Sequence, residues 1–234
     1  EIAEAKPVGV FRILLLGDSF TEGYRLPIEE SPPRRIARYF ERAGCADRIE
    51  VVNAAVASYS PILEYLLLKK VGLRLHPDLV VLNFDMGDVH EDFVRTKLAR
   101  LDVDGLPLAV PADLIAEGAL VMLPWGTPDW LSFLTPWETF AAGSALEQAF
   151  HATTVEHNPF RRSRLTLDRL RALHLVGDIQ HDPMAPTREE ETASVEAGWV
   201  LSSRYVTAVY RLARDHGARF LLVTYPYPHQ VSAT

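Results

Sequence analysis

Residues 11–23 read FRILLLGDSFTEG, and this stretch decides the fold. Residues 11–16 form a short apolar run that ends at Gly17, which is typical of a strand buried on both faces of a parallel sheet. Asp18 and Ser19 follow directly, so polar side chains stand where the strand ends. Active sites in such sheets lie beyond the carboxyl ends of the strands, which makes Ser19 the first candidate for chemistry.

Three further strands and three helices are predicted along the rest of the chain. The other strand-like runs are residues 49–52, 78–84 and 219–225. Helical patterns cover residues 32–43, 60–71 and 187–216. Ser60 is a candidate N-cap of the second helix, and Thr187 with Glu190 has the spacing of a capping box for the third. This alternation predicts an α/β fold: a three-layer α/β/α sandwich, flavodoxin-like, with a mostly parallel sheet.

The length of the chain and one interruption in its alternation of strands and helices indicate the domain organisation. A chain of 234 residues is long enough for one well-buried α/β domain, so we expect a single domain over residues 1–234. Residues from about 94 to 186 interrupt the alternation of strands and helices and are predicted to be an insertion or lid after the third strand.

The composition and charge indicate which binding partners and cofactors to expect. The net charge is -7, with 48% hydrophobic and 24% charged residues, and no Lys/Arg run forms a basic face. We therefore expect a globular protein without a nucleic-acid or anionic-membrane partner. The eight histidines show no metal-ligand spacing, so no metal and no organic cofactor is expected.

The compartment is not fixed by the sequence. Cys45 is the single cysteine, which excludes an internal disulfide framework. No apolar run approaches the roughly 18 residues that a membrane helix needs. Residues 1–7 have no signal-peptide features, and an extracytoplasmic location would require that a leader had been removed.

Three segments resemble the sequence blocks of the GDSL, or SGNH, hydrolase superfamily. Residues 17–23 (GDSFTEG) are similar to its first block. Residues 52–58 (VNAAVAS) resemble the second block, in which a glycine usually stands at the place of Ser58. Residues 80–88 (VVLNFDMGD) resemble the third block, which usually ends Gly-x-Asn-Asp and so has asparagine at the place of Gly87. Both replacements make these two blocks degenerate.

The resemblance implies a serine esterase or lipase-like hydrolase that works through an acyl-serine on Ser19. The oxyanion would be held by the N–H of Ser19, the N–H of Ser58 and the side chain at position 87. Gly87 supplies no such side chain, and the loss of one donor typically lowers the rate by about 10²–10³. Asp88 matches the final Asp of the block and is expected to organise the loop.

The general base has several candidates. The family's Asp-x-x-His block follows a further strand, and we expect it to lie beyond Thr234 or to be absent. Within the chain, Asp178 and His181 have the required spacing but precede the last predicted strand. His90 and His229 each follow the carboxyl end of a predicted strand and are weaker alternatives.

Other functions remain open beside the esterase. The substrate would be a small-molecule ester or an acylated carbohydrate, and an O-acetyl transferase or deacetylase of the same superfamily is an alternative. A degenerate domain that binds an acyl or glycan ligand without turnover is a second. A nucleotide-binding module is disfavoured, because neither G-x-G-x-x-G nor a P-loop follows the first strand.

Overall fold

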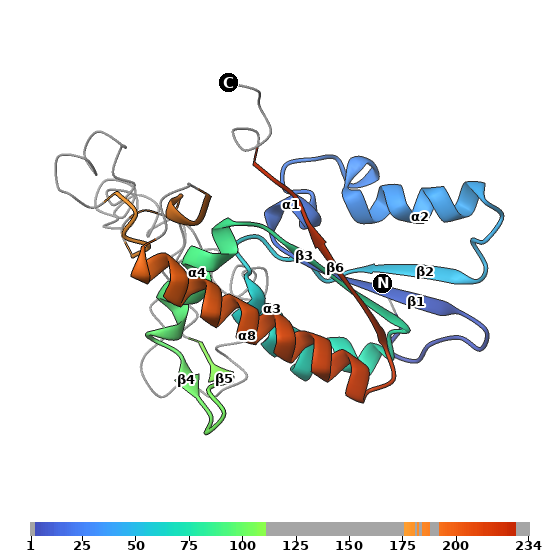
Figure 1. Cartoon of the computed structure of the whole chain (residues 1–234). Helices are drawn as coiled ribbons and strands as arrows, with labels where there is room; N and C mark the ends of the chain where they lie inside the picture. Colours follow the sequence, from blue (N-terminus) through green and yellow to red (C-terminus); the bar gives the residue numbers. More distant parts are fainter. Residues whose placement is uncertain (1–2, 111–175, 181, 183, 188–191, 228–234) are drawn as a thin grey trace, which may run out of the picture. The chain divides into compact units, whose positions relative to one another are not determined.

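The computed structural model describes residues 3–110, 176–180, 182, 184–187 and 192–227 (Figure 1). Its main sheet has the strand order β2-β1-β3-β6, and all neighbouring pairs are parallel. The strands are β1 (Phe11–Leu16), β2 (Ile49–Asn53), β3 (Leu79–Phe84) and β6 (Arg219–Thr224). All four strands lie where the sequence predicts them, and the parallel sheet is confirmed.

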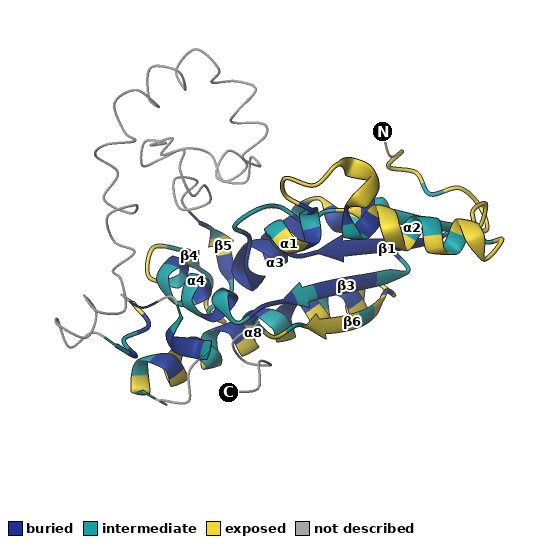
Figure 2. Ribbon diagram, turned by 90° about the horizontal axis from the view of Figure 1, so that it is seen from above, coloured by how far each residue is buried: buried dark blue, intermediate teal, exposed yellow. Residues whose placement is uncertain are grey.

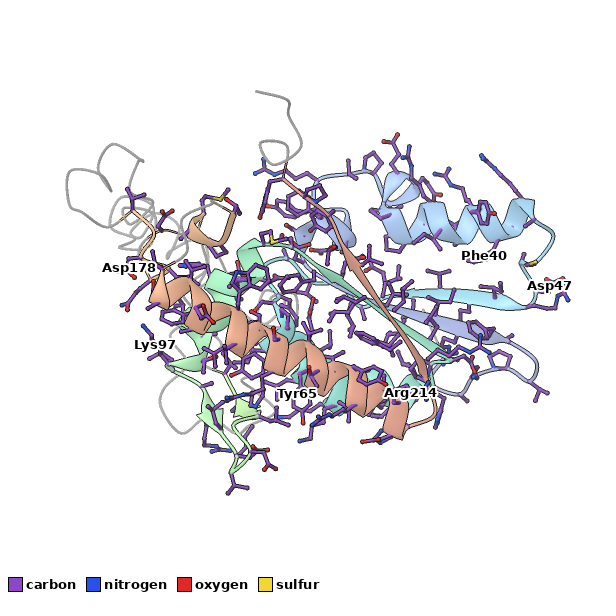
Figure 3. All side chains as sticks on the ribbon, viewed as in Figure 1. Phe40, Asp47, Tyr65, Lys97, Asp178 and Arg214 are labelled. Carbon is purple, nitrogen blue, oxygen red and sulfur yellow. The ribbon has the colours of Figure 1, made fainter. Side chains whose placement is uncertain are left out.

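Helices cover both faces of this sheet. On one face, Ile13, Leu15 and Val81 form a buried cluster, against which Phe40 of α2 (Pro32–Arg42) packs (Figure 3). On the other face lies α3 (Pro61–Lys70), and Leu14 points toward it: a Cβ added to Gly72, just after α3, would come within 2.9 Å of the Leu14 side chain. The predicted three-layer α/β/α arrangement is therefore confirmed (Figure 1).

The strands differ in how deeply they are buried. In Figure 2, β1 and β3 are mostly buried, whereas β6 carries exposed residues along most of its length. Because β1 is flanked by β2 and β3, the polar turn that follows it leaves the sheet from a rigid, central position.

The last helix begins later than predicted. Helix α8 spans Ala193–Asp215, and the hydroxyl oxygen of Thr192 caps it by accepting a hydrogen bond of 3.3 Å from the Val195 N–H. Thr187 lies in the separate short helix η5 (Ala185–Thr187), where its hydroxyl donates to the carbonyl of Met184. The predicted start at Thr187 is wrong because this local bond closes a turn there, and Glu190 lies outside the described residues. Ser60 stands at the N-cap position of α3 as predicted, although its side chain makes no capping bond.

The chain divides into two compact units, one of residues 1–85 with 203–234 and one of residues 86–202. In its described part, the second unit contains α4 (Gly87–Thr96), η5, the start of α8 and a small antiparallel hairpin of β4 (Arg100–Leu101) and β5 (Pro107–Ala109). The predicted insertion falls within this second unit, and residues 111–175 lie outside the described residues.

Helix α4 was not predicted from the sequence. Polar residues occupy several of its buried positions, among them Asp92, which accepts a hydrogen bond of 2.7 Å from the Ser202 hydroxyl of α8. Such buried polar side chains interrupt the apolar periodicity by which a helix is normally recognised. Among the described residues, no helix is both long and apolar enough to span a membrane.

Candidate active site

The turn after β1 is held in a tight conformation by Gly17. A Cβ added to Gly17 would lie 2.3 Å from Oγ1 and 2.7 Å from Cβ of Thr21, a residue that is almost fully buried in helix α1 (Ser19–Glu22). Real Cβ atoms do not approach other atoms so closely, so only glycine fits between the strand and the helix. The chain can therefore reverse directly from β1 into α1.

Asp18 caps α1 and determines which backbone donors stay available. Its Oδ1 accepts hydrogen bonds from the N–H groups of Phe20, at 2.9 Å, and Thr21, at 3.5 Å. The first N–H groups of a helix have no partner inside the helix, and Asp18 satisfies the second and third of them. The N–H of Ser19 is the first, and no described group accepts a hydrogen bond from it.

Ser19 itself is the first residue of α1 and is half-buried, so its side chain is reachable from solvent. No described residue forms a hydrogen bond with its hydroxyl group. At the carboxyl end of the central strand β1, the N–H and the hydroxyl group of Ser19 are thus both without a hydrogen-bond partner among the described residues. This pair is what an attacking serine requires: one group to react and one to hold the oxyanion.

The loop after β2 is fastened to this turn. The Val56 N–H donates to the carbonyl of Gly17 at 3.0 Å, and the Ala57 N–H donates to Oε2 of Glu22 at 2.8 Å. Ser58 follows immediately, so the first and second resembled blocks lie side by side in the first unit. Strand β3 is also joined to helix α1, by a hydrogen bond of 2.9 Å from Nδ2 of Asn83 to Oγ1 of Thr21.

Ser58 has left-handed backbone geometry, with φ +64°. Left-handed geometry disfavours a residue with a Cβ by about 1–2 kcal/mol, and glycine adopts it freely. The glycine usual at this place in the resembled block is the residue that this geometry favours.

We expect Ser58→Gly to raise the free energy of unfolding by about 0.5–1 kcal/mol, because relief of the left-handed strain outweighs the greater flexibility of glycine in the unfolded chain. Chemical denaturation of both proteins checks this. A matched control is Ser203→Gly on the exposed face of α8, which we expect to lower stability. A loss of stability in Ser58→Gly would contradict the strain at this position.

A second group of polar side chains lies beside the turn that carries Ser19. Tyr225, just after β6, places its hydroxyl 3.4 Å from Oδ1 of Asp18 and 3.4 Å from Oδ2 of Asp85, which follows β3. The Tyr227 hydroxyl donates to Oδ1 of Asp85 at 3.2 Å. Burial raises the pKa of Asp18 to about 6, with a further contribution from the charge of Asp85 and from their mutual hydrogen bond.

Sequence reasoning did not find this carboxyl pair. Asp85 stands where the third resembled block has its glycine, so the departure was visible as a carboxylate in place of a residue without a side chain. What the sequence does not show is that the residues after β1, β3 and β6 meet at one edge, which follows from the registers Leu16↔Leu82 and Phe84↔Thr224.

The remaining predicted residues lie elsewhere. Gly87 is the first residue of α4 rather than part of a loop, and it belongs to the second unit. Ser19 and Ser58, in contrast, both belong to the first unit. Asp88 is buried in the first turn of α4.

The candidate bases are not brought to Ser19 by the first unit. His90 lies in α4, in the second unit, with Nδ1 against the carbonyl of Ile179. Asp178 closes a local turn by accepting from the N–H of Gln180 at 3.1 Å. His181 and His229 lie outside the described residues. Within the described part of the chain, no group of three or more His, Cys, Asp or Glu residues could hold a metal ion.

Comparisons with known proteins add the following. No protein-family model matches the chain, and no curated protein matches it. Among solved structures, a gut microbial diltiazem-metabolizing enzyme is 13% identical with a TM-score of 0.33, covering 94% of this chain and 38% of its own. TesA is 15% identical with a TM-score of 0.31, covering 88% of this chain and 99% of its own.

A lipase from a goat rumen metagenome is 10% identical with a TM-score of 0.30, covering 91% of this chain and 80% of its own. The chain spans about two fifths of the length of the diltiazem-metabolizing enzyme. With TM-scores this low, none of the three supports an inference about activity.

Proposed function

We propose that this chain is an SGNH-type serine hydrolase that cleaves a carboxylic ester through an acyl-serine intermediate on Ser19. The observation that carries the proposal is the state of Ser19. It stands at the carboxyl end of β1 with its N–H and its hydroxyl uncommitted among the described residues, while Asp18 satisfies the neighbouring N–H groups. The resemblance of residues 17–23, 52–58 and 80–88 to the family's three blocks supports the same assignment.

The reaction would proceed in two steps. Oγ of Ser19 attacks the ester carbonyl carbon as a base removes its proton, and the oxyanion accepts hydrogen bonds from the N–H of Ser19 and, by resemblance, the N–H of Ser58. The C–O bond to the alcohol breaks, and the alcohol takes the proton from the base. Water then attacks the acyl-serine, which releases the carboxylic acid and restores the hydroxyl. No metal or organic cofactor enters these steps.

The substrate class we propose is a small-molecule ester, with an acylated carbohydrate as an alternative. If an acceptor hydroxyl replaced water in the second step, the same acyl-serine would serve an O-acetyl transferase.

A second candidate function is ligand binding without turnover. It is favoured by Gly87, which has no side chain at the position where the resembled block has its asparagine donor. The absence of one oxyanion donor lowers a rate by about 10²–10³ without preventing binding. A domain that kept the acyl pocket but lost this donor would bind an ester and turn it over slowly or not at all.

Hydrolysis of p-nitrophenyl acetate distinguishes the two functions. The enzyme proposal expects release of p-nitrophenol that depends on Ser19, with a burst of about one equivalent if deacylation is slow. The binding proposal expects no release by the protein, together with saturable binding of a non-hydrolysable ester analogue that Ser19→Ala leaves unchanged.

A further inference from the structure

The side chain of Glu22 reaches from helix α1 to the loop after β2, and the reaction described above gives it no role. Its Oε2 accepts a hydrogen bond of 2.8 Å from the Ala57 N–H, and its carbonyl accepts one of 3.3 Å from Nδ2 of Asn53. Oδ1 of Asn53 in turn accepts a hydrogen bond of 3.1 Å from the Ala55 N–H. Glu22 thus holds this loop both through its side chain and through its backbone.

The loop ends in a turn that carries Ser58. Residues 56–59 form a β-turn, which the Tyr59 N–H closes by donating to the carbonyl of Val56 at 3.0 Å. Ala57 and Ser58 are its central residues, and the φ of +64° at Ser58 is typical of the third residue of a type II turn. Because the turn fixes the backbone angles of Ala57, the direction of the Ser58 N–H depends on where the Ala57 N–H is held.

This turn is anchored to the chain on both sides of Ser19. The Val56 N–H donates to the carbonyl of Gly17 at 3.0 Å, and the Ala57 N–H donates to Glu22. Two neighbouring N–H groups held by separate acceptors fix both the position and the rotation of the turn, whereas one anchor would let it pivot. The anchor at Gly17 is a backbone group, so the anchor at Glu22 is the one that depends on a side chain. Its acceptor is a carboxylate, which forms the stronger kind of hydrogen bond.

We propose that Glu22 positions the turn that carries Ser58, so that the Ser58 N–H faces the oxyanion formed at Ser19. The role in the reaction rests on the proposed function, whereas the link between Glu22 and the turn does not. Glu22 is a positioning residue, because it acts through the Ala57 N–H rather than on the ester. Since Gly87 supplies no side-chain donor, the oxyanion would depend on the two N–H groups, and their relative position would govern the rate.

The role requires a hydrogen-bond acceptor at position 22 and not a charge. Glutamine has the same length as glutamate and still offers an oxygen, whereas aspartate is one methylene shorter and alanine has no acceptor. A general base, in contrast, would need the carboxylate itself. Glu22→Gln therefore distinguishes a positioning role from a role in proton transfer.

Hydrogen exchange of the Ala57 amide in the full chain tests the link and requires no activity. The protein is labelled with nitrogen-15 alanine, and the Ala57 signal is assigned as the one lost in Ala57→Ser. We expect exchange at Ala57 to be about tenfold faster in Glu22→Ala than in the wild type, because a hydrogen bond to a charged group is lost. In Glu22→Gln, exchange should stay within about threefold of the wild type. Unchanged exchange in Glu22→Ala would overturn the link.

The kinetics of p-nitrophenyl acetate hydrolysis test the positioning role. An oxyanion donor acts mainly in the transition state, so Glu22→Ala should lower kcat by about 10–10²-fold and leave KM within about threefold. Glu22→Gln should recover most of kcat, because its amide oxygen accepts the same hydrogen bond. A change in KM alone, or a Glu22→Gln variant as slow as Glu22→Ala, would overturn the positioning role.

The matched control is Glu30, an exposed glutamate in the short helix η1 (Ile28–Glu30). Glu30→Ala also removes a carboxylate and should change neither exchange at Ala57 nor kcat. Glu22→Asp answers the same questions if Glu22→Ala does not fold: exchange should be faster and kcat lower, and wild-type values of both would overturn the proposal. If no hydrolysis depends on Ser19 while exchange at Ala57 responds as expected, the proposed function fails and the link stands.

Discussion

Ser19→Ala is expected to lower the rate of ester hydrolysis by about 10³-fold or more, because the attacking oxygen is lost and the remaining groups only bind the substrate and its oxyanion. Stability should change by less than about 0.5 kcal/mol, since no described residue forms a hydrogen bond with the Ser19 hydroxyl. Initial rates with p-nitrophenyl acetate and thermal unfolding of both proteins check the two parts.

Ser203→Ala is the matched control, because Ser203 is exposed on α8 and has no role in the proposed reaction. It should retain the full rate. If Ser19→Ala keeps more than a tenth of the wild-type rate, the nucleophile is another residue or the activity does not belong to this protein.

Gly17→Ala is expected to lower both the free energy of unfolding and the rate of ester hydrolysis. The added Cβ would meet Oγ1 of Thr21 at 2.3 Å, so α1 must shift away from β1 and strain its bond to Asn83. We expect a loss of about 1–3 kcal/mol in the free energy of unfolding, as for other overpacked sites. The rate should fall about 10²-fold, because Ser19 moves with α1 and small displacements of reacting groups have large effects.

Two further variants distinguish the clash of the new Cβ at position 17 from the general effect of replacing a glycine. A Cβ at Gly44, which has φ +72°, meets nothing within 4 Å, so Gly44→Ala should reduce stability and leave the rate unchanged. Thr21→Ala removes the nearest atom, so Gly17→Ala should have a smaller effect on stability in that background than in the wild type. Equal effects in both backgrounds would show that the contact with Thr21 is not the cause.

The sheet could be predicted from the sequence because each of its strands is a short apolar run followed by a change in composition. That signal is local, and residues 11–16, 49–52, 78–84 and 219–225 all carry it. The start of α8 and the whole of α4 could not be predicted in the same way. In α8 a capping-box spacing at Thr187 competes with the true cap at Thr192, and in α4 buried polar residues such as Asp92 hide the helical period.

For the candidate site, too, the local sequence patterns could be recognised, whereas the contacts between distant segments could not. Ser19 and Ser58 each lie in a segment with a recognisable pattern, and the structure joins their loops through Gly17 and Glu22. The partnership of Asp18 and Asp85 depends on strand order and register, and the tyrosine after β6 was assigned to a strand when it in fact leaves the sheet to reach both carboxyl groups. No spacing rule relates residues so far apart in the chain.

The most direct test of the nucleophile is chemical labelling. The protein is treated with a fluorophosphonate, digested with trypsin and analysed by mass spectrometry, with Ser19→Ala as the parallel sample. We expect one phosphonate on the tryptic peptide of residues 13–25, located at Ser19, and none on the variant. An unmodified peptide in the native protein, or a label that persists in Ser19→Ala, would contradict it.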